Sequence, residues 1–378
     1  MTVFDLSLDE LRRRQSLKWQ AYPPDVLPVW VAEMDCRPAP PVLAALTEAA
    51  SDGDTGYPIG RSYEQALAEY AAATWDWTFD PVAQAIPVPD VMQGIIAVLD
   101  LLGTRGAPVV INPPVYPQFY KYLQWAGRPI IEVQQTAEGR IDLAGLEAAF
   151  SGAHGVKPEA YLLCNPQNPQ GTAPTREELT AVARLAAEHG VRIVSDEIHA
   201  PLVSAPARHT PILAVDGIQD AVIIISASKA WNLAGLKAAV AIGSPDIAPR
   251  LVAMPDEVTH SISYLGVRTH VTALTEGQPW LDEVLSEIEA NRRLLSSLLA
   301  EQLPQVRYLP GDATYLAWLD CRELGLDDPG TTFLDRGRVA LNNGLTFGAG
   351  GTGHVRMNLA TSPEIITEAV RRMAASLD

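Results

Sequence analysis

Cysteine and basic residues are scarce in this sequence, and each scarcity excludes a class of protein. Three cysteines, Cys36, Cys164 and Cys321, are spread over 378 residues with neither CxxC spacing nor a Cys/His ligand set. We therefore expect buried thiols instead of a disulfide framework or a metal site. Lysine and arginine number 28 against 45 acidic residues, which gives a net charge of -17. Because no lysine- or arginine-rich run offsets this charge, nucleic acid and anionic membranes should be repelled.

Long apolar runs are also missing. No window approaches the roughly 20 apolar residues of a membrane span. The opening stretch MTVFDLSLDELRRR carries charges where a signal peptide needs an apolar segment. The sequence therefore predicts a cytosolic (cytoplasmic) protein. Since 47% of the residues are hydrophobic and 19% are charged, the chain is apolar enough to bury a large core.

The middle of the chain alternates helical and strand-like segments. Helices are expected over residues 91–102 and 175–189, and strands over 108–111, 191–195, 221–225 and 238–242. The last two strands are continuous apolar runs, which are typical of a parallel sheet covered on both faces. We therefore predict a large α/β domain over residues 41–280.

The order of elements changes after about residue 280. A long amphipathic helix to about residue 303 is followed by a strand near 315–319, a helix near 331–339, a strand over 355–359 and a last helix. This mixed order predicts a small C-terminal α+β domain over residues 281–378. Residues 1–40 are rich in proline and tryptophan and show little periodicity, so we expect this N-terminal segment to pack on the small domain.

A lysine follows the apolar strand over 221–225, in the segment Ser226-Ala227-Ser228-Lys229. The carboxyl end of a parallel strand is where α/β sheets bind ligands. Burial there lowers the pKa of an amine, so that a neutral amine becomes available for imine formation. Taken alone, such a lysine is more often a surface residue at a strand end.

Two more polar segments lie upstream. Ser195-Asp196-Glu197-Ile198-His199 ends a buried strand, and an acid at that position could keep a pyridine nitrogen protonated. The turn Asn165-Pro166-Gln167-Asn168-Pro169-Gln170-Gly171-Thr172 could direct an amide at a ligand. Taken alone, the aspartate is more often a helix N-cap, and the turn is as often only a turn.

The motifs NPQNPQGT, SDEIH and SASKAWNLAGLK occur in this order and together resemble those of the fold-type I pyridoxal-phosphate (PLP) enzymes, the aminotransferase class I/II superfamily. The resemblance covers nearly the whole chain. It implies an aspartate-aminotransferase-like α/β fold, with a mainly parallel sheet in a large domain and a small C-terminal α+β domain. It also implies that PLP is bound as a Schiff base to Lys229, the catalytic lysine.

The resemblance assigns other residues to the cofactor ring. Asp196 would partner the pyridine nitrogen, and Asn168 would hydrogen-bond the ring hydroxyl oxygen. Tyr116, in the segment PPVY, would stack on the ring. His199 stands in the cofactor site where most transaminases have a tyrosine.

The resemblance also implies a phosphate site and a homodimer. Ser226 and Lys237 would bind the phosphate, and Met92 and Gln93 would cradle it with backbone N–H groups at a helix start. Tyr57, in the segment GYPIG, would reach the phosphate of the partner subunit. The two active sites would then share residues across a dimer.

The substrate side is assigned by the segment HVRMN. The resemblance implies that Arg356 grips the α-carboxylate of an amino acid with a bidentate fork, and that Trp30 and Tyr116 also contact the substrate.

The N-terminal segment is similar to one branch of the superfamily. Lys18-Trp19 and the later LPVWVAEMD resemble the signature of the cystathionine β-lyase (C–S lyase) branch, which also has SDEIH. Glu33 stands where the branch usually has aspartate, and Cys36 where it usually has an aromatic residue. The branch implies a C–S β-lyase that cleaves L-cystathionine or related cysteine S-conjugates to thiol, pyruvate and ammonia. An aminotransferase is the alternative, because the two reactions differ only by substrate placement.

Two of the segments also match motifs of unrelated proteins. Ser226 to Lys229 also fits the SxxK pattern of penicillin-recognising acyltransferases, but the KTG and SDN partners are absent. Residues 348–353 match GxGxxG, but too few residues follow for a βαβ unit, so a loop leading to Arg356 is expected. A non-enzymatic effector-binding module is disfavoured because the lysine, aspartate and arginine set is complete.

Overall fold

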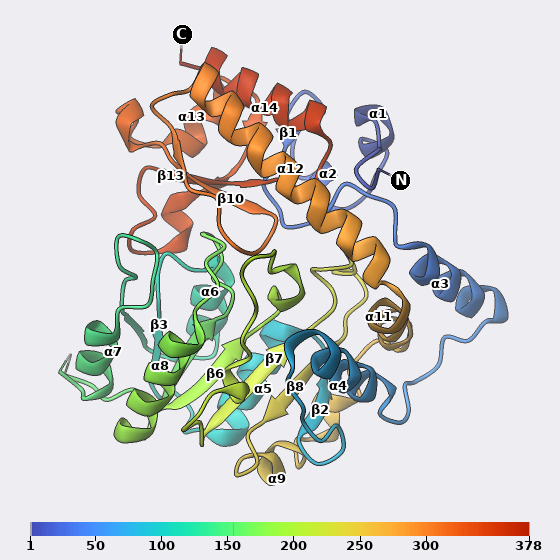
Figure 1. Ribbon diagram of the computed structural model, residues 1–378, viewed down its shortest axis with the longest axis vertical. Helices are drawn as coiled ribbons and strands as arrows, with labels where there is room; N and C mark the ends of the chain where they lie inside the picture. The colour runs from blue at the N-terminus through green and yellow to red at the C-terminus, as the bar shows by residue number, and fades with distance from the viewer. Residues whose placement is uncertain (1, 154, 378) are drawn as a thin grey trace.

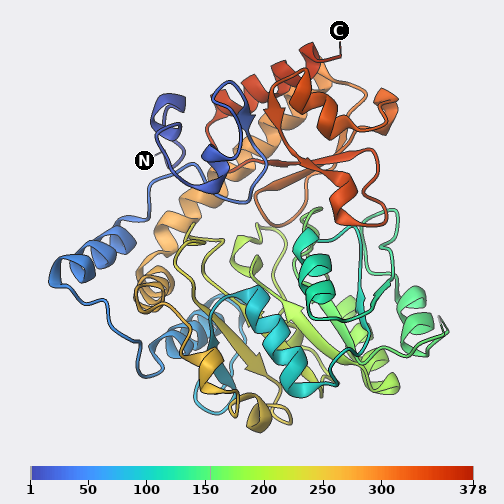
Figure 2. The ribbon, with the colours of Figure 1, turned by 180° about the vertical axis from the view of Figure 1, so that it is seen from behind.

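The computed structural model describes residues 2–153 and 155–377. Figure 1 shows a large sheet with helices on both faces in the lower part of the molecule and a smaller group of helices and strands above it. The upper group consists of C-terminal elements, coloured orange to red, with the blue N-terminal segment beside them, as Figure 2 shows from behind.

The large sheet has seven strands in the order β2-β8-β7-β6-β5-β3-β4. They are β2 (Ala85–Val88), β8 (Ala239–Gly243), β7 (Ala221–Ile225), β6 (Arg192–Asp196), β5 (Ala160–Cys164), β3 (Val109–Ile111) and β4 (Ile130–Glu132). Strands β7, β6, β5, β3 and β4 pair in parallel. β8 is antiparallel to both of its neighbours. The expectation of a mainly parallel sheet is therefore confirmed, although the apolar run near 238–242 forms its one antiparallel strand among the described residues.

The middle of the sheet is buried on both faces because strands β3, β5, β7 and β8 carry apolar residues at consecutive positions. In β7, Val222 and Ile224 join one core cluster with α5, whereas Ile223 and Ile225 join another with α4 and α8. The cyan α5 lies behind the sheet in Figure 1 and in front of it in Figure 2. Continuous apolar strands thus place the sheet between two helical layers.

The helices of this region range from one turn to four. They are α3 (Pro40–Asp52), α4 (Ser62–Trp75), α5 (Val91–Leu102), α6 (Pro117–Trp125), α7 (Leu143–Phe150), α8 (Arg176–His189), α9 (Ala248–Leu251), α10 (Asp256–Thr259) and α11 (Tyr264–Glu276), with short 3-10 turns at Ala200–Leu202 and Ile212–Ala214.

The smaller region contains an antiparallel sheet in the order β12-β13-β10-β9. Its elements are α12 (Gln278–Gln302), β9 (Arg307–Tyr308), β10 (Leu316–Asp320), α13 (Pro329–Asp335), β11 (Val339–Ala340), β12 (Asn342–Asn343), β13 (His354–Asn358) and α14 (Pro363–Ala375), with 3-10 turns at Arg322–Leu324 and Gly344–Phe347. The long helix α12 extends from the large region into this one (Figure 1).

The helix expected near residues 331–339 ends earlier than predicted. α13 stops at Asp335, and Arg338 adopts a positive φ of 55°, which a helix cannot contain. Val339 and Ala340 instead form β11. The apolar residues after Arg338 were thus wrongly assigned to the helix.

The N-terminal segment forms α1 (Leu8–Leu11), α2 (Leu17–Gln20) and β1 (Leu27–Pro28). β1 pairs in parallel with β11, and Trp19 and Leu27 belong to the same apolar cluster as Met357 of β13. The boundaries at residues 40 and 280 stay predictions. Over the part of the chain that the structure describes, no helix has the length and apolar character needed to cross a membrane.

Candidate active site

A cavity of about 140 Å³ opens at the carboxyl ends of the parallel strands. β7, β6, β5 and β3 each end in a segment that contributes to its wall, because parallel strands end at the same edge of a sheet. The predicted site residues that line it are Met92, Tyr116, Asn168, Asp196, His199, Ser226, Lys229 and Lys237. Residues distant in sequence are thus brought to one site.

Lys229 lies in the turn after β7 and is half-buried. Its Nζ donates a hydrogen bond to the carbonyl oxygen of Ala32 at 2.8 Å. Burial, and next the positive charge of Arg356, lower the pKa of Lys229 to about 8. Roughly a tenth of the amine is then neutral at pH 7, so Lys229 can act as a nucleophile or a base.

Asp196 is the last residue of β6 and is buried. Its Oδ1 accepts a hydrogen bond from the backbone N–H of Ile198 at 3.1 Å. Burial raises the pKa of Asp196 to about 7, and the neighbouring charge of Glu197 acts in the same direction. A cation placed against this carboxyl would stabilise its ionised form.

His199 follows β6 at the edge of the cavity. Burial is the largest cause that lowers its pKa to about 3, so the imidazole is neutral at physiological pH. Its ring meets the ring of Tyr315 edge to face at 6.3 Å. Among the described residues its Nδ1 has no hydrogen-bond partner, so this buried nitrogen is available for a hydrogen bond to a ligand.

Arg356 enters from β13 of the smaller region and is buried. Its guanidinium donates to the side-chain oxygen of Asn168 at 2.9 Å and to that of Asn342 at 2.6 Å. It also donates to the Trp30 carbonyl at 3.2 Å and lies 5.1 Å from the Phe347 ring centroid. No carboxylate within the described ranges pairs with it. A buried guanidinium held only by neutral acceptors is suited to an anionic ligand.

The start of α5 presents two free backbone donors. Asp90, the N-cap, accepts the N–H of Gln93 at 2.9 Å and pairs with Lys237 Nζ at 3.1 Å. The N–H groups of Val91 and Met92 make no hydrogen bond among residues that the structure describes. Gln93 itself is exposed and outside the cavity. Of the predicted pair, Met92 lines the cavity together with Val91, whereas Gln93 does not, and the phosphate role of both stays a prediction.

The Ser226 hydroxyl makes two hydrogen bonds to the backbone of residues 228 and 238. It donates to the carbonyl of Ala238 at 2.7 Å and accepts from the N–H of Ser228 at 3.1 Å. These bonds hold the turn that carries Lys229, so Ser226 supports the cavity wall as well as lining it.

The predicted residues that do not line this cavity are Gln93, Arg356, Tyr57 and Trp30. Tyr57 is 90% exposed, as required of a side chain that would serve another subunit. Trp30 is half-buried, with its ring against Tyr22 at 5.6 Å. It reaches the site through its carbonyl, which contacts Arg356.

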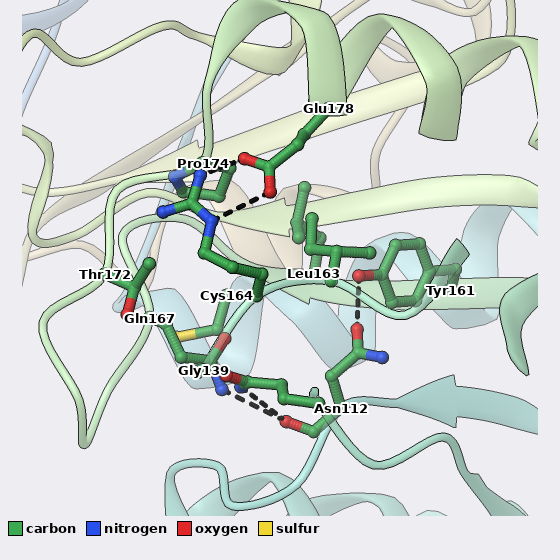
Figure 3. Close-up of a pocket in the computed structure, with 12 residues that line it drawn as sticks. Asn112, Gly139, Tyr161, Leu163, Cys164, Gln167, Thr172, Pro174 and Glu178 are labelled. Carbon is green, nitrogen blue, oxygen red and sulfur yellow. Dashed lines mark hydrogen bonds and ion pairs between the residues drawn. The ribbon is translucent and has the colours of Figure 1, made fainter. Parts of the chain in front are cut away.

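A polar network supports the segments that carry Asn168 and Tyr116. Figure 3 shows the part of this network around Asn112, beside a second, water-sized cavity of about 10 Å³. Gln167 donates to the carbonyls of Asn112 and Pro114 at 3.1 and 2.9 Å, and the Tyr161 hydroxyl donates to the Asn112 side chain. The turn with Asn168 and the segment before Tyr116 are thus linked below the site.

Sequence reasoning missed the residues that act through the backbone or from distant elements. The Ala32 carbonyl accepts from Lys229 and also from the hydroxyl of Tyr315 at 3.1 Å. Asn342 holds Arg356. Tyr315 and Asn342 lie outside the motifs. Ala32 lies within LPVWVAEMD, but a backbone carbonyl leaves no trace in residue type, so the motif did not point to this contact.

Lys229 should react as a neutral amine at unusually low pH when no cofactor is bound. Because burial lowers its pKa to about 8, reductive methylation by formaldehyde and cyanoborohydride should reach half its maximal rate near pH 8. Mass spectrometry of the Lys229 peptide measures this, and the exposed Lys121 serves as the reference for the reagent. A half-point near 10.5 would contradict the effect of burial.

Comparison with known proteins agrees with this geometry. A family profile described as "Aminotransferase class I and II" matches residues 26–373. A "Putative cystathionine beta-lyase" of Mycobacterium tuberculosis is 49% identical, with 99% of this chain and 97% of that protein covered. The "Cystathionine beta-lyase PatB" of Bacillus subtilis is 32% identical, with 96% of this chain and 97% of that protein covered.

The fold is matched by solved structures. The structure of a "putative plp-dependent beta-cystathionase" of Corynebacterium diphtheriae has a TM-score of 0.92 at 34% identity, covering 100% of this chain and 99% of that one. The predicted aspartate-aminotransferase-like fold is therefore confirmed. On the family match and these relatives, the chain belongs to the aminotransferase class I and II family.

Proposed function

We propose that this protein is a PLP-dependent C–S β-lyase that cleaves L-cystathionine or related cysteine S-conjugates to thiol, pyruvate and ammonia. The observation that carries the proposal is the cavity in which the Lys229 amine, the Asp196 carboxyl and the Asn168 amide meet, with the unpaired Arg356 guanidinium bonded to Asn168. The choice of lyase over aminotransferase is supported by relatives named cystathionine β-lyase.

The residues of the cavity fit PLP. Asp196 would face the pyridine nitrogen, since its carboxyl has one backbone donor and lacks a cation partner among the described residues. The Asn168 oxygen is occupied by Arg356, which leaves its amide N–H₂ for the ring hydroxyl oxygen. Tyr116 would stack on the ring, and His199 would close its edge.

The phosphate would lie at the start of α5. The free N–H groups of Val91 and Met92 point out of a helix N-terminus, which favours an anion. Lys237 and the Ser226 turn would complete the site, with Lys237 exchanging part of its contact with Asp90 for the phosphate.

When bound, PLP supplies a conjugated ring that takes up the electron pair left at the substrate α-carbon. Arg356 would hold the substrate carboxylate, and Lys229 Nζ would remove the α-proton as a general base. The pair returned to the substrate would form a double bond between the α- and β-carbons as the C–S bond breaks, and the thiolate would leave with the C–S bonding pair. Water would then hydrolyse the remaining fragment to pyruvate and ammonia. No amino-group acceptor is needed, which separates this reaction from transamination.

Turnover without an acceptor tests the function directly. Incubation with L-cystathionine or an S-alkyl cysteine should yield pyruvate, ammonia and thiol in equal amounts with no 2-oxo acid added. Lys229→Ala is the control and should form no product, because the base is lost. Absolute dependence on a 2-oxo acid would replace the lyase by an aminotransferase.

Arg356→Ala should lower kcat/KM for free amino-acid substrates roughly thirty-fold to several thousand-fold, since losing one desolvated bidentate pair costs about 2–5 kcal/mol. Arg356→Lys should fail as well, because a point charge does not reproduce the planar fork. The exposed Arg322, paired with Asp320, provides a matched control in Arg322→Ala. Near-normal kcat/KM in Arg356→Ala would place the carboxylate site elsewhere.

We also propose a cytoplasmic homodimer with shared active sites. Tyr57 and Ile59 are 90% and 96% exposed on one protruding loop, a cost to solubility unless a partner covers them. Tyr57 would then reach the phosphate of the other subunit.

Mixed dimers test this arrangement. Tyr57→Phe subunits and Lys229→Ala subunits should each be impaired, but a dimer of the two contains one site with both native residues. Activity should therefore rise when the variants are dissociated and mixed, measured as pyruvate release. An active monomer at low concentration would argue against shared sites.

A further inference from the structure

Two buried side chains, from helices α4 and α11, form a hydrogen-bonded chain to the turn that carries Lys229. Tyr63, from the first turn of α4, is 1% exposed, and His270, from α11, is fully buried. The Tyr63 hydroxyl accepts a hydrogen bond from the N–H of Ala227 at 3.1 Å and lies 2.9 Å from His270 Nδ1. Neither residue lines the cavity that contains Lys229.

The imidazole of His270 is neutral, so it interacts with the Tyr63 phenol by a hydrogen bond and not as an ion pair. Burial lowers its pKa to about 3, so no proton is available for a charged pair with the phenol. With the hydrogen on Nε2, Nδ1 accepts the phenol proton, and the Tyr63 oxygen keeps a lone pair for Ala227. Tyr63 thus connects a helix of the core to the backbone of the turn.

Tyr63 is the external anchor of the turn over residues 226–229. Within the turn, Ser228 N–H is taken by the Ser226 hydroxyl. No other side chain from outside residues 226–238 hydrogen-bonds to the turn's backbone in the ranges that the structure describes. Beside the bonds within residues 226–238, the Tyr63 oxygen is therefore the side-chain contact that fixes the turn relative to α4.

Helix α11 contacts the far end of the same segment. The N–H of Ser263 donates to the carbonyl of Lys237 at 2.9 Å. A Cβ at Gly266 would lie 3.0 Å from the carbonyls of Leu236 and Lys237, so the helix packs directly on the chain there. α11 therefore contacts the segment at Lys237 and, through His270 and Tyr63, at Ala227.

We propose that Tyr63 and His270 are positioning residues that fix the Ser226–Lys229 turn for the phosphate group of the cofactor. The proposal rests on the proposed function, in which this turn meets the phosphate. Neither residue lines the cavity that would hold the cofactor, so the pair would act through the backbone at Ala227. The effect should depend on the ligand having a phosphate.

Comparing PLP with pyridoxal, which lacks the phosphate, isolates this effect. The holoenzyme is stripped of cofactor, and the dissociation constants of both ligands are measured by titration of the visible absorbance. In Tyr63→Phe the ratio of the pyridoxal constant to the PLP constant should fall roughly tenfold, because one buried donor loses its acceptor. Pyridoxal affinity should change little.

Two further variants separate positioning from general stability. Tyr70→Phe removes another buried phenol of α4, one bonded to Thr74 of the same helix, and should leave the ratio unchanged. His270→Phe should lower the ratio in the same direction as Tyr63→Phe, and His270→Gln, with an amide oxygen in place of Nδ1, should restore part of it. If Tyr63→Phe does not fold, the ratios measured for the two His270 variants test the positioning role in its place.

An unchanged ratio in Tyr63→Phe, or an equal loss of both affinities, would overturn the positioning role and leave the proposed function intact. A parent protein that binds PLP no better than pyridoxal would overturn the proposed function, and this inference with it.

Discussion

Ionisable groups are buried at one edge of the large sheet, and the rest of the fold has to stabilise them there. Asp196 and Arg356 are each almost fully buried, and Lys229 is half-buried in the wall of the cavity. A buried charge without a partner costs several kcal/mol, so the fold has to supply neutral dipoles around each one. The backbone N–H of Ile198, the amide of Asn168 and the carbonyl of Ala32 do so. These dipoles satisfy the groups only in part, which favours a ligand that carries the missing charges.

The stretch over residues 30–36 shows how much of the fold serves this purpose. The Trp30 carbonyl accepts a hydrogen bond from Arg356, and the Ala32 carbonyl accepts one from Lys229. A fully buried ion pair between Lys18 and Asp35, at 2.6 Å, holds the stretch from the N-terminal side. Breaking such a pair leaves a buried charge uncompensated. The N-terminal segment is therefore part of the active-site wall, although it contributes mainly backbone atoms there.

Sequence was sufficient where the chemistry is local to a strand end. Lys229 and Asp196 follow apolar runs, and strand geometry then brings their side chains to the same edge. For Gln93 the sequence pattern was not sufficient, because which backbone donors stay free depends on the N-cap: Asp90 takes the Gln93 N–H and leaves that of Met92 free. Ala32, which acts through a carbonyl, carries no such signal. Local pattern predicts the elements and motifs, but the partners of each polar atom depend on tertiary contacts.

The contact between Arg356 and Asn168 links substrate placement to cofactor placement. One amide accepts from the guanidinium through its oxygen and, in the proposed function, would donate to the ring hydroxyl oxygen through its nitrogen. A carboxylate held by Arg356 is then fixed relative to the ring, and with it the α-carbon whose proton Lys229 would remove. Rotation about the remaining bonds of the substrate decides which group stands where it can leave. In the proposed function, reaction outcome would therefore depend on how the cavity walls receive the β-substituent, while the removal of the α-proton by Lys229 would be common to lyase and aminotransferase.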